Sequence, residues 1–365
     1  MAYQKQQAIV EATVAHAVIL TFPFEKSNSD CYIFFMNEKM NIRKIAELAA
    51  CAPSTVSRVL SGNYGSVRVG EETKRRILDV CRRENYTPDI NAKRLFTKRT
   101  GVFGLLVPPG MGQDSSILNR FINSIYAELG KNALRLLLLV ADERFFKEGQ
   151  SLSLFKRREI DALIIWGMQS QRASEIKELL DQENTVAILS ANRLNGAPCV
   201  CADDRKGIFE LTKHCQKRGA SKFLYIGGPE DSDVSLRRKS GFMDAVGKNK
   251  SKLLPGDFSI KAGQHAAKSI ASYKPDAVIC VNDLTALGVI KGLKKKNIRI
   301  PKDIMLTGAG NILLSEHVEP ALTTFSSRED LQGKLCVKQL ISFLKNKKPL
   351  KSETVPPQII IRDSA

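Results

Sequence analysis

Residues 42–60, IRKIAELAACAPSTVSRVL, constrain the fold more than any other part of the chain. Apolar side chains recur at helical spacing from Ile42 to Ala49, and again at Val56, Val59 and Leu60, which predicts two short amphipathic helices. Pro53 suits the first position of the second helix, where a missing N–H costs nothing. Because only residues 50–52 separate the helices, they must cross sharply, as in a helix-turn-helix.

The outward face of the second predicted helix is chemically suited to nucleic acid. Burying its apolar stripe turns short hydroxyls and one long cation outward, namely Ser54, Thr55, Ser57 and Arg58. Hydroxyls reach phosphates or bases in a major groove, and an arginine can fork onto a guanine edge. The bland alternative is a helical hairpin packed on some other core, which the two-helix pattern alone does not exclude.

The charge distribution favours a polyanionic partner. The chain has 365 residues, a formal net charge of +18 and a pI near 9.6, so two or more domains are expected. Residues 41–99 hold 13 Lys and Arg against 6 Asp and Glu. An anionic membrane surface is the lesser candidate, and a generally basic proteome would give the same total charge. The apolar runs are too short to span a bilayer.

The cysteines and the first 39 residues argue against a metal-binding protein and a secreted protein. Eight cysteines are scattered singly except for Cys199-Val-Cys201. We interpret that pair as one face of a buried strand, in preference to half a metal site, and expect reduced thiols in a cytoplasmic protein. No metal or cofactor is predicted. Residues 1–39 make a poor secretory signal. We expect them to be a disordered extension, or translation to start at Met36 or Met40.

The segments 45–49 (IAELA) and 55–60 (TVSRVL) closely resemble the DNA-binding headpiece of the lactose/galactose repressor family. The resemblance makes residues 40–87, with a third helix over 71–85 that Pro88 ends, a DNA-binding headpiece. It also places Pro53 and Ser54 at the two positions that vary most with operator sequence.

Residues 88–99 are predicted to be a basic hinge. Asn85-Tyr-x-Pro88, followed by Ala92 and Leu95, resembles the family's hinge helix; a plain charged linker is the alternative. In that family two hinge helices pair in the minor groove and insert a leucine, which here would be Leu95. Asn91 and Lys93 are the accompanying DNA-binding candidates.

Residues 100–365 alternate apolar strands with helical segments, which predicts two doubly wound parallel sheets. The expected architecture is a bilobal, periplasmic-binding-protein-like core joined to the all-α headpiece and hinge helix. We assign residues 100–198 and 328–351 to the first lobe, and residues 199–327 and 352–363 to the second.

An effector pocket is expected at the carboxyl ends of the second lobe's strands. The segments Arg238-x-x-Gly-Phe242, Gly256-Asp-Phe258 and 281–288 (VNDLTALG) resemble the family's pocket segments. The resemblance implies that Arg238, Phe258, Asn282 and Asp283 bind the effector, with Phe258 against an apolar sugar face. Asp283 could instead cap a helix, and Arg238 could form a salt bridge within its lobe.

One departure concerns the strand at residues 304–307. Many relatives follow that strand with Gly-aromatic-Asp, but this chain has Gly308-Ala-Gly-Asn311. The effector could therefore be acidic, phosphorylated or differently oriented.

The predicted function is a ligand-controlled transcription regulator, in this family usually a repressor. Two chains would bind a pseudo-palindromic operator in double-stranded DNA, near the nucleoid, under control of a carbohydrate-like effector. The chain ends soon after residue 362 without a leucine-heptad tail, so a homodimer is expected. The alternatives are a solute-binding protein without DNA function and, less favoured, a sugar-processing enzyme, since no nucleophile or metal motif is recognisable.

Overall fold

The computed structural model describes residues 40–61, 64, 67–87, 99–110, 116–147, 150–168 and 170–365. The predicted extension at 1–39, and the hinge candidates Asn91, Lys93 and Leu95, lie outside those residues. Contacts divide the chain into two compact units, Met1–Lys93 and Arg94–Ala365. Within the described part of the chain, no helix is both long and apolar enough to cross a membrane.

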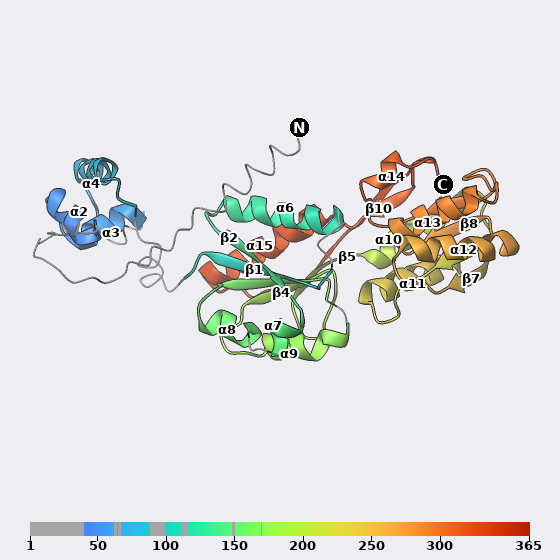
Figure 1. The fold of residues 1–365 in the computed structure, drawn as a ribbon, viewed down its shortest axis with the longest axis horizontal. Coiled ribbons are helices and arrows are strands. Elements are labelled where there is room, and N and C mark those ends of the chain that lie inside the picture. Colours follow the sequence, from blue (N-terminus) through green and yellow to red (C-terminus); the bar gives the residue numbers. More distant parts are fainter. Residues whose placement is uncertain are drawn as a thin grey trace, which may run out of the picture. The chain divides into compact units, whose positions relative to one another are not determined.

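The headpiece consists of α2 (Ile42–Leu48), α3 (Pro53–Ser61) and α4 (Glu71–Arg83) (Figure 1). This confirms the three helices expected from the apolar spacing, and Pro53 is the first residue of α3 as predicted. The three helices share one small core. Its buried members are Ile45, Ala46, Ala49, Val56, Val59, Ile77, Val80 and Cys81.

The turn between α2 and α3 is a Schellman motif built on an alanine. Ala50 has a φ of 47°, in the left-handed region. The amide of Cys51 donates to the carbonyl of Ala46 at 3.0 Å, and that of Ala50 donates to Glu47 at 3.1 Å. Glycine is the usual residue at such a position because its backbone lacks the Cβ clash. The tight connection between the two helices therefore holds one residue in a strained conformation.

Helix α4 ends in the same motif, which corrects the prediction that Pro88 ends it. Asn85 has a φ of 48°, and the amide of Tyr86 donates to the carbonyl of Cys81 at 2.8 Å. The helix stops at Arg83, several residues before the proline. Asparagine adopts the left-handed conformation more readily than most residues, so Asn85 is the terminating signal.

The first lobe of the core is built on a six-stranded sheet with the strand order β11-β5-β4-β3-β1-β2. All of its strand pairs are parallel. The strands are β1 (Val102–Val107), β2 (Arg135–Val140), β3 (Ala162–Trp166), β4 (Ala187–Ser190), β5 (Cys199–Ala202) and β11 (Glu353–Val355).

Helices cover both faces of this sheet (Figure 1). On one face lie α6 (Ser116–Gly130) and α15 (Glu329–Asn346), and on the other lie α7 (Glu143–Lys147), α8 (Gln150–Lys156), η1 (Ser170–Arg172) and α9 (Ala173–Leu180). Each face has its own apolar cluster, one centred on Phe121 and one on Phe145.

The second lobe repeats the plan with a four-stranded parallel sheet ordered β7-β6-β8-β9. Its strands are β6 (Lys222–Ile226), β7 (Lys250–Leu254), β8 (Ala277–Cys280) and β9 (Met305–Thr307). The helices are α10 (Asp204–Lys217), α11 (Asp233–Val246), α12 (Ile260–Tyr273), α13 (Asp283–Lys294) and α14 (Leu314–His317). One core lies under α10 and α11, and the other lies under α12 and α13. The predicted pair of doubly wound parallel sheets is confirmed.

The predicted lobe boundaries need correction at two strands. We assigned residues 199–327 and 352–363 to the second lobe, but β5 and β11 belong to the first sheet, where they pair with each other. After β11 the chain returns to the second lobe as β12 (Gln358–Ile360), antiparallel to β10 (Thr324–Ser326). The chain therefore passes between the lobes three times, after β5, after β10 and after β11.

Strand β7 was not predicted, because its residues Lys250-Ser-Lys-Leu-Leu254 do not form an apolar run. It lies at the edge of the second sheet and is mostly exposed. Lysines on an edge strand discourage pairing with other chains, so the same composition that hides the strand in the sequence suits its position.

Candidate functional site

The predicted DNA-reading residues lie on the open face of α3. Pro53 and Ser54 are exposed, whereas Thr55, Ser57 and Arg58 are partly exposed. Val56 and Val59, on the opposite face, are buried against α2 and α4. The structure thus puts all five candidates on one helix that anchors itself by its apolar stripe.

The C-terminal end of α2 is held by an arginine from α4. The Nε of Arg76 donates to the carbonyl oxygen of Ala49 at 2.7 Å. At the other end of α2, the side chain of Asn41 accepts hydrogen bonds from the amides of Arg43 and Lys44. The sequence analysis did not assign either role. Together they fix the helix that precedes the turn, and hence the direction in which α3 leaves it.

In the core, Asn282 and Phe258 lie in contact at the carboxyl end of β8. The side-chain nitrogen Nδ2 of Asn282 donates to the backbone carbonyl of Phe258 at 2.9 Å, and the side-chain oxygen Oδ1 accepts from the backbone amide of Thr285. Asn282 is thus the N-cap of α13, which corrects the alternative that Asp283 caps this helix. The Phe258 ring packs closely over Gly228, where a Cβ would lie 2.7 Å from a ring carbon.

Asp283 is fully buried and its carboxylate is saturated with donors. It accepts from the Thr324 hydroxyl at 2.6 Å, the Ile312 amide at 2.9 Å and the Ser315 hydroxyl at 2.8 Å. Burial nevertheless raises the pKa of this carboxyl above its ordinary value, with the hydrogen bonds acting in the opposite direction. Asp283 therefore holds the loop after β9 against α13 and offers little free capacity to a ligand.

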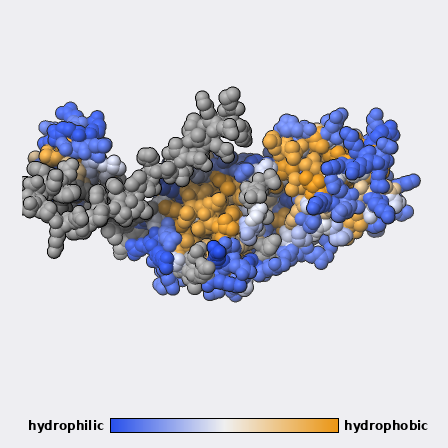
Figure 2. Space-filling view, viewed as in Figure 1, coloured by the Kyte–Doolittle hydropathy of each residue, from blue (hydrophilic) through white to orange (hydrophobic). Residues whose placement is uncertain are grey.

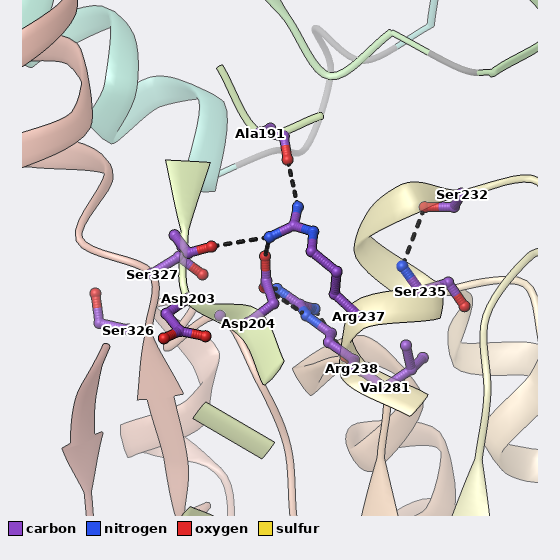
Figure 3. Close-up of polar contacts among 12 residues, drawn as sticks. Ala191, Asp203, Asp204, Ser232, Ser235, Arg237, Arg238, Val281, Ser326 and Ser327 are labelled. Carbon is purple, nitrogen blue, oxygen red and sulfur yellow. Dashed lines mark hydrogen bonds and ion pairs between the residues drawn. The ribbon is translucent and has the colours of Figure 1, made fainter. Parts of the chain in front are cut away.

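Arg238 forms the salt bridge within its lobe that the sequence analysis left open. Its guanidinium is buried, pairs with Asp204 at 2.8 Å and donates to the Val281 carbonyl at 2.7 Å. It also lies over the ring of Phe325, 5.4 Å from the centroid. Figure 3 shows Arg238 beside Arg237, with Asp204 between them. The four effector candidates thus gather near the end of β8, and each polar one already has protein partners.

The residue that departs from the family pattern, Asn311, is also engaged. Its side-chain oxygen accepts from Arg362 at 2.9 Å, and its backbone oxygen accepts from Arg120 of the first lobe at 2.9 Å. Sequence reasoning missed Arg120 altogether, because its partners lie almost two hundred residues away along the chain.

Cys199 and Cys201 are buried on β5, as the strand interpretation predicted. Their thiols are free of disulfides. No cluster of three or more metal-ligating side chains occurs among the described residues. The Cys-x-Cys pair is therefore part of the apolar packing between the sheet and the helices on that face.

Comparison with known proteins gives two family matches. Residues 41–89 match the model of bacterial regulatory proteins of the lacI family, and residues 212–365 match the periplasmic binding protein-like domain. Residues 41–89 are thus a lacI-type DNA-binding domain. A related protein, the HTH-type transcriptional regulator DegA of Bacillus subtilis, is 26% identical over 336 residues, covering 89% of this chain and 98% of DegA.

Solved structures agree on the fold. The lac repressor dimer bound to operator and an anti-inducer aligns with a TM-score of 0.74 and 18% identity, covering 89% of this chain and 98% of that one. The transcriptional regulator CelR in complex with cellobiose aligns with a TM-score of 0.66 and 19% identity, covering 90% and 100%. The chain therefore shares a DNA-binding domain with bacterial regulatory proteins of the lacI family and the fold of the lac repressor.

Proposed function

We propose that the chain is a repressor whose affinity for an operator is set by a small, carbohydrate-like molecule bound between the two lobes. The observation that supports this most is the convergence of Arg238, Phe258 and Asn282 at the strand ends of the second lobe. In open α/β sheets ligands bind at the carboxyl ends of the strands. An aromatic ring beside amide and guanidinium donors suits the apolar face and hydroxyls of a sugar.

The DNA half of the proposal rests on α3. Pro53, Ser54, Thr55, Ser57 and Arg58 would read the major groove, and the hinge residues Asn91, Lys93 and Leu95 would contact the minor groove. A selection of the full chain against random duplex DNA at near-physiological salt tests this. We expect a two-fold symmetric motif. Unselected sequence, with binding that disappears as salt rises, would reduce the basic segment to non-specific attraction.

The effector half is tested by ligand-induced stabilisation. The full chain would be heated with neutral mono- and disaccharides, and separately with sugar phosphates. A ligand present at one hundred times its Kd should stabilise the core by about 2.7 kcal/mol. It should also shift operator binding, because both effects draw on one coupling free energy. A sugar that raises the melting temperature but leaves operator affinity unchanged would contradict ligand control.

We infer that the regulator works as a homodimer. Strand β2 lies at the open edge of the first sheet, and Leu138, Val140 and nearby Tyr126 on α6 are exposed. Figure 2 shows apolar surface over this part of the first lobe and around α14, where Leu313 and Leu314 are exposed. Apolar surface beside an unpaired edge strand is typical of an interface. Sedimentation of the full chain should give a dimer, and Leu138→Asp should shift it toward monomer.

A further inference from the structure

Arg237 on α11 reaches from the second lobe to the first. Its Nη2 donates to the carbonyl of Ala191 at 2.6 Å, and its Nη1 donates to the carbonyl of Ala202 at 2.8 Å. Ala191 follows β4 and Ala202 ends β5, so both acceptors belong to the first sheet. Figure 3 shows the side chain extended toward Ala191, away from its neighbour Arg238.

The guanidinium of Arg237 is largely buried, with 13% of the side chain exposed. Two carboxylates balance its charge, Asp204 at 2.7 Å and Asp233 at 3.1 Å. A buried arginine is tolerated only when its donors are satisfied, and here carboxylate and carbonyl oxygens surround the group. The fork geometry of a guanidinium lets one side chain serve acceptors from both lobes.

Asp204 connects this contact to the candidate pocket. One of its oxygens, Oδ2, pairs with Arg237, whereas Oδ1 pairs with Arg238. Arg238 in turn donates to Val281, immediately before the pocket residue Asn282. A continuous chain of charged hydrogen bonds therefore runs from the strand end of β8 to the strand ends of β4 and β5. A carboxylate shared by two guanidinium groups holds each less firmly than a dedicated one would.

We propose that Arg237, with Asp204, Ala191 and Ala202, is an interlobe latch that fixes the angle between the lobes and couples it to the pocket. A ligand oxygen that engages Arg238 would release Oδ1 of Asp204, and the carboxylate would then hold Arg237 more firmly. The arrangement in which Arg237 contacts Ala191 and Ala202 would then gain population, because its free energy is lowered by the stronger pairing of Arg237 with Asp204. The coupling part rests on the proposed function, whereas the latch itself does not. Arg237 is thus a positioning residue that need not touch the ligand.

A second arginine spans the lobes in the opposite direction and gives a useful contrast. Arg120 on α6 donates to the carbonyls of Gly310 and Asn311 at 2.6 and 2.9 Å. Its carboxylate partner is Glu329, at the start of α15, at 3.0 Å. No hydrogen bond or ion pair of Glu329 with a candidate pocket residue is found in the described part of the chain. Burial raises the pKa of Glu329, and the Arg238 charge acts in the opposite direction. Arg120 therefore depends on Arg238 only through that charge, and not through a shared carboxylate as Arg237 does.

The latch is tested by the distance between the lobes in the full chain without ligand. Nitroxides attached to a keto amino acid at the exposed positions 178 and 261 avoid the native cysteines and mark one lobe each. Arg237→Gln should broaden the distance distribution and lengthen its mean. Arg205→Gln is the matched control, since Arg205 pairs with Asp244 on α11 within the second lobe and is exposed. Its distribution should match that of the parent chain.

Arg237→Lys keeps one ion pair but cannot serve both carbonyls, so its distribution should lie between those of the parent and Arg237→Gln. If Arg237→Gln does not fold, the distance distribution of Arg237→Lys is used to test the latch instead. A distribution for folded Arg237→Gln, or failing that for Arg237→Lys, that superimposes on the parent's would overturn the latch.

Operator affinity separates the latch from the coupling. With an operator obtained by selection, ligand-free Arg237→Gln should change its Kd about fivefold or more, in line with ordinary allosteric coupling. The Arg205→Gln control should leave the Kd within about twofold of the parent's. Lobes that separate without any change in operator affinity would show that the lobe angle does not control operator binding, and would leave the latch in place. If no operator is recovered at all, the proposed function fails, and the distance measurement still decides whether Arg237 is a latch.

Discussion

The two candidate sites differ in how their polar groups are used. On α3 the candidates for reading DNA point away from the headpiece core and are wholly or partly exposed. At the end of β8, Arg238, Asn282 and Asp283 are engaged with protein partners. A surface like the first gains affinity by adding contacts. A site like the second can respond only by exchanging one partner for another, which makes its occupancy and its conformation interdependent.

The largest expected effect is at the shared carboxylate. Asp204→Ala leaves two buried guanidinium groups without their common partner, so we expect a loss of about 3–5 kcal/mol in the free energy of unfolding of the core. Urea denaturation followed by circular dichroism measures it. Asp244→Ala removes an aspartate from the exposed pair with Arg205 and should leave the stability close to the parent's. Equal losses in the two variants would mean that the buried network is no more important than a surface pair.

Asp283 should show the cost of a saturated buried carboxylate. In the Asp283→Asn variant an amide NH₂ group replaces one carboxylate oxygen and faces donors that this oxygen accepted from in the parent chain. We expect the free energy of unfolding to fall by about 1–3 kcal/mol. The pKa of Asp283 is raised in the folded chain. Its contribution is therefore favourable at low pH and is lost as pH rises through that raised pKa. The stability difference, parent minus variant, should fall as the pH rises from the ordinary carboxyl range toward the raised pKa of Asp283; a difference that rises with pH would contradict the burial argument.

On the exposed side of the comparison, Arg58→Ala should act on recognition and not on folding. We expect a loss of about 1–3 kcal/mol in discrimination at one base position of each half-site. Competition binding with single-base operator variants measures it. Arg83→Ala removes the same charge from the last turn of α4 and serves as the control. A uniform weakening on all sequences would show that Arg58 contacts phosphate only.

The smallest effect tests the turn that directs α3. Ala50→Gly relieves the left-handed strain at that residue and should stabilise the headpiece by about 1 kcal/mol or less. Ala49→Gly is the opposite case, because Ala49 is buried and has a φ of −91°, so that variant should destabilise. Hydrogen exchange of the α2 and α3 amides, measured as the temperature is raised, distinguishes the two variants. If both variants stabilised the headpiece, strain at Ala50 would not be the cause of the gain in stability.

The local pattern of the sequence was enough to predict the headpiece helices and most core strands. Apolar periodicity is strong at Val56 and Val59 in α3 and along β1 and β8. It could not order the strands, so the membership of β5 and β11 in one sheet was missed. A pattern of residue types also cannot show which buried charged side chains contact one another. The adjacent pair Arg237-Arg238 was the available signal for the latch, but its partners lie up to 46 residues away.

The exchange of strands between the lobes also bears on how the chain is made. The first lobe's core includes Cys336, Val337 and Leu340 of α15, and its sheet is completed by β11. A ribosome must therefore deliver most of the second lobe, from α10 to β10, before the first can close its core. Until then the emerging helix α6 leaves Phe121 and Ile125 without their final packing partners. Chaperone capture of nascent chains truncated between residues 202 and 330 is the expected cost of this connectivity.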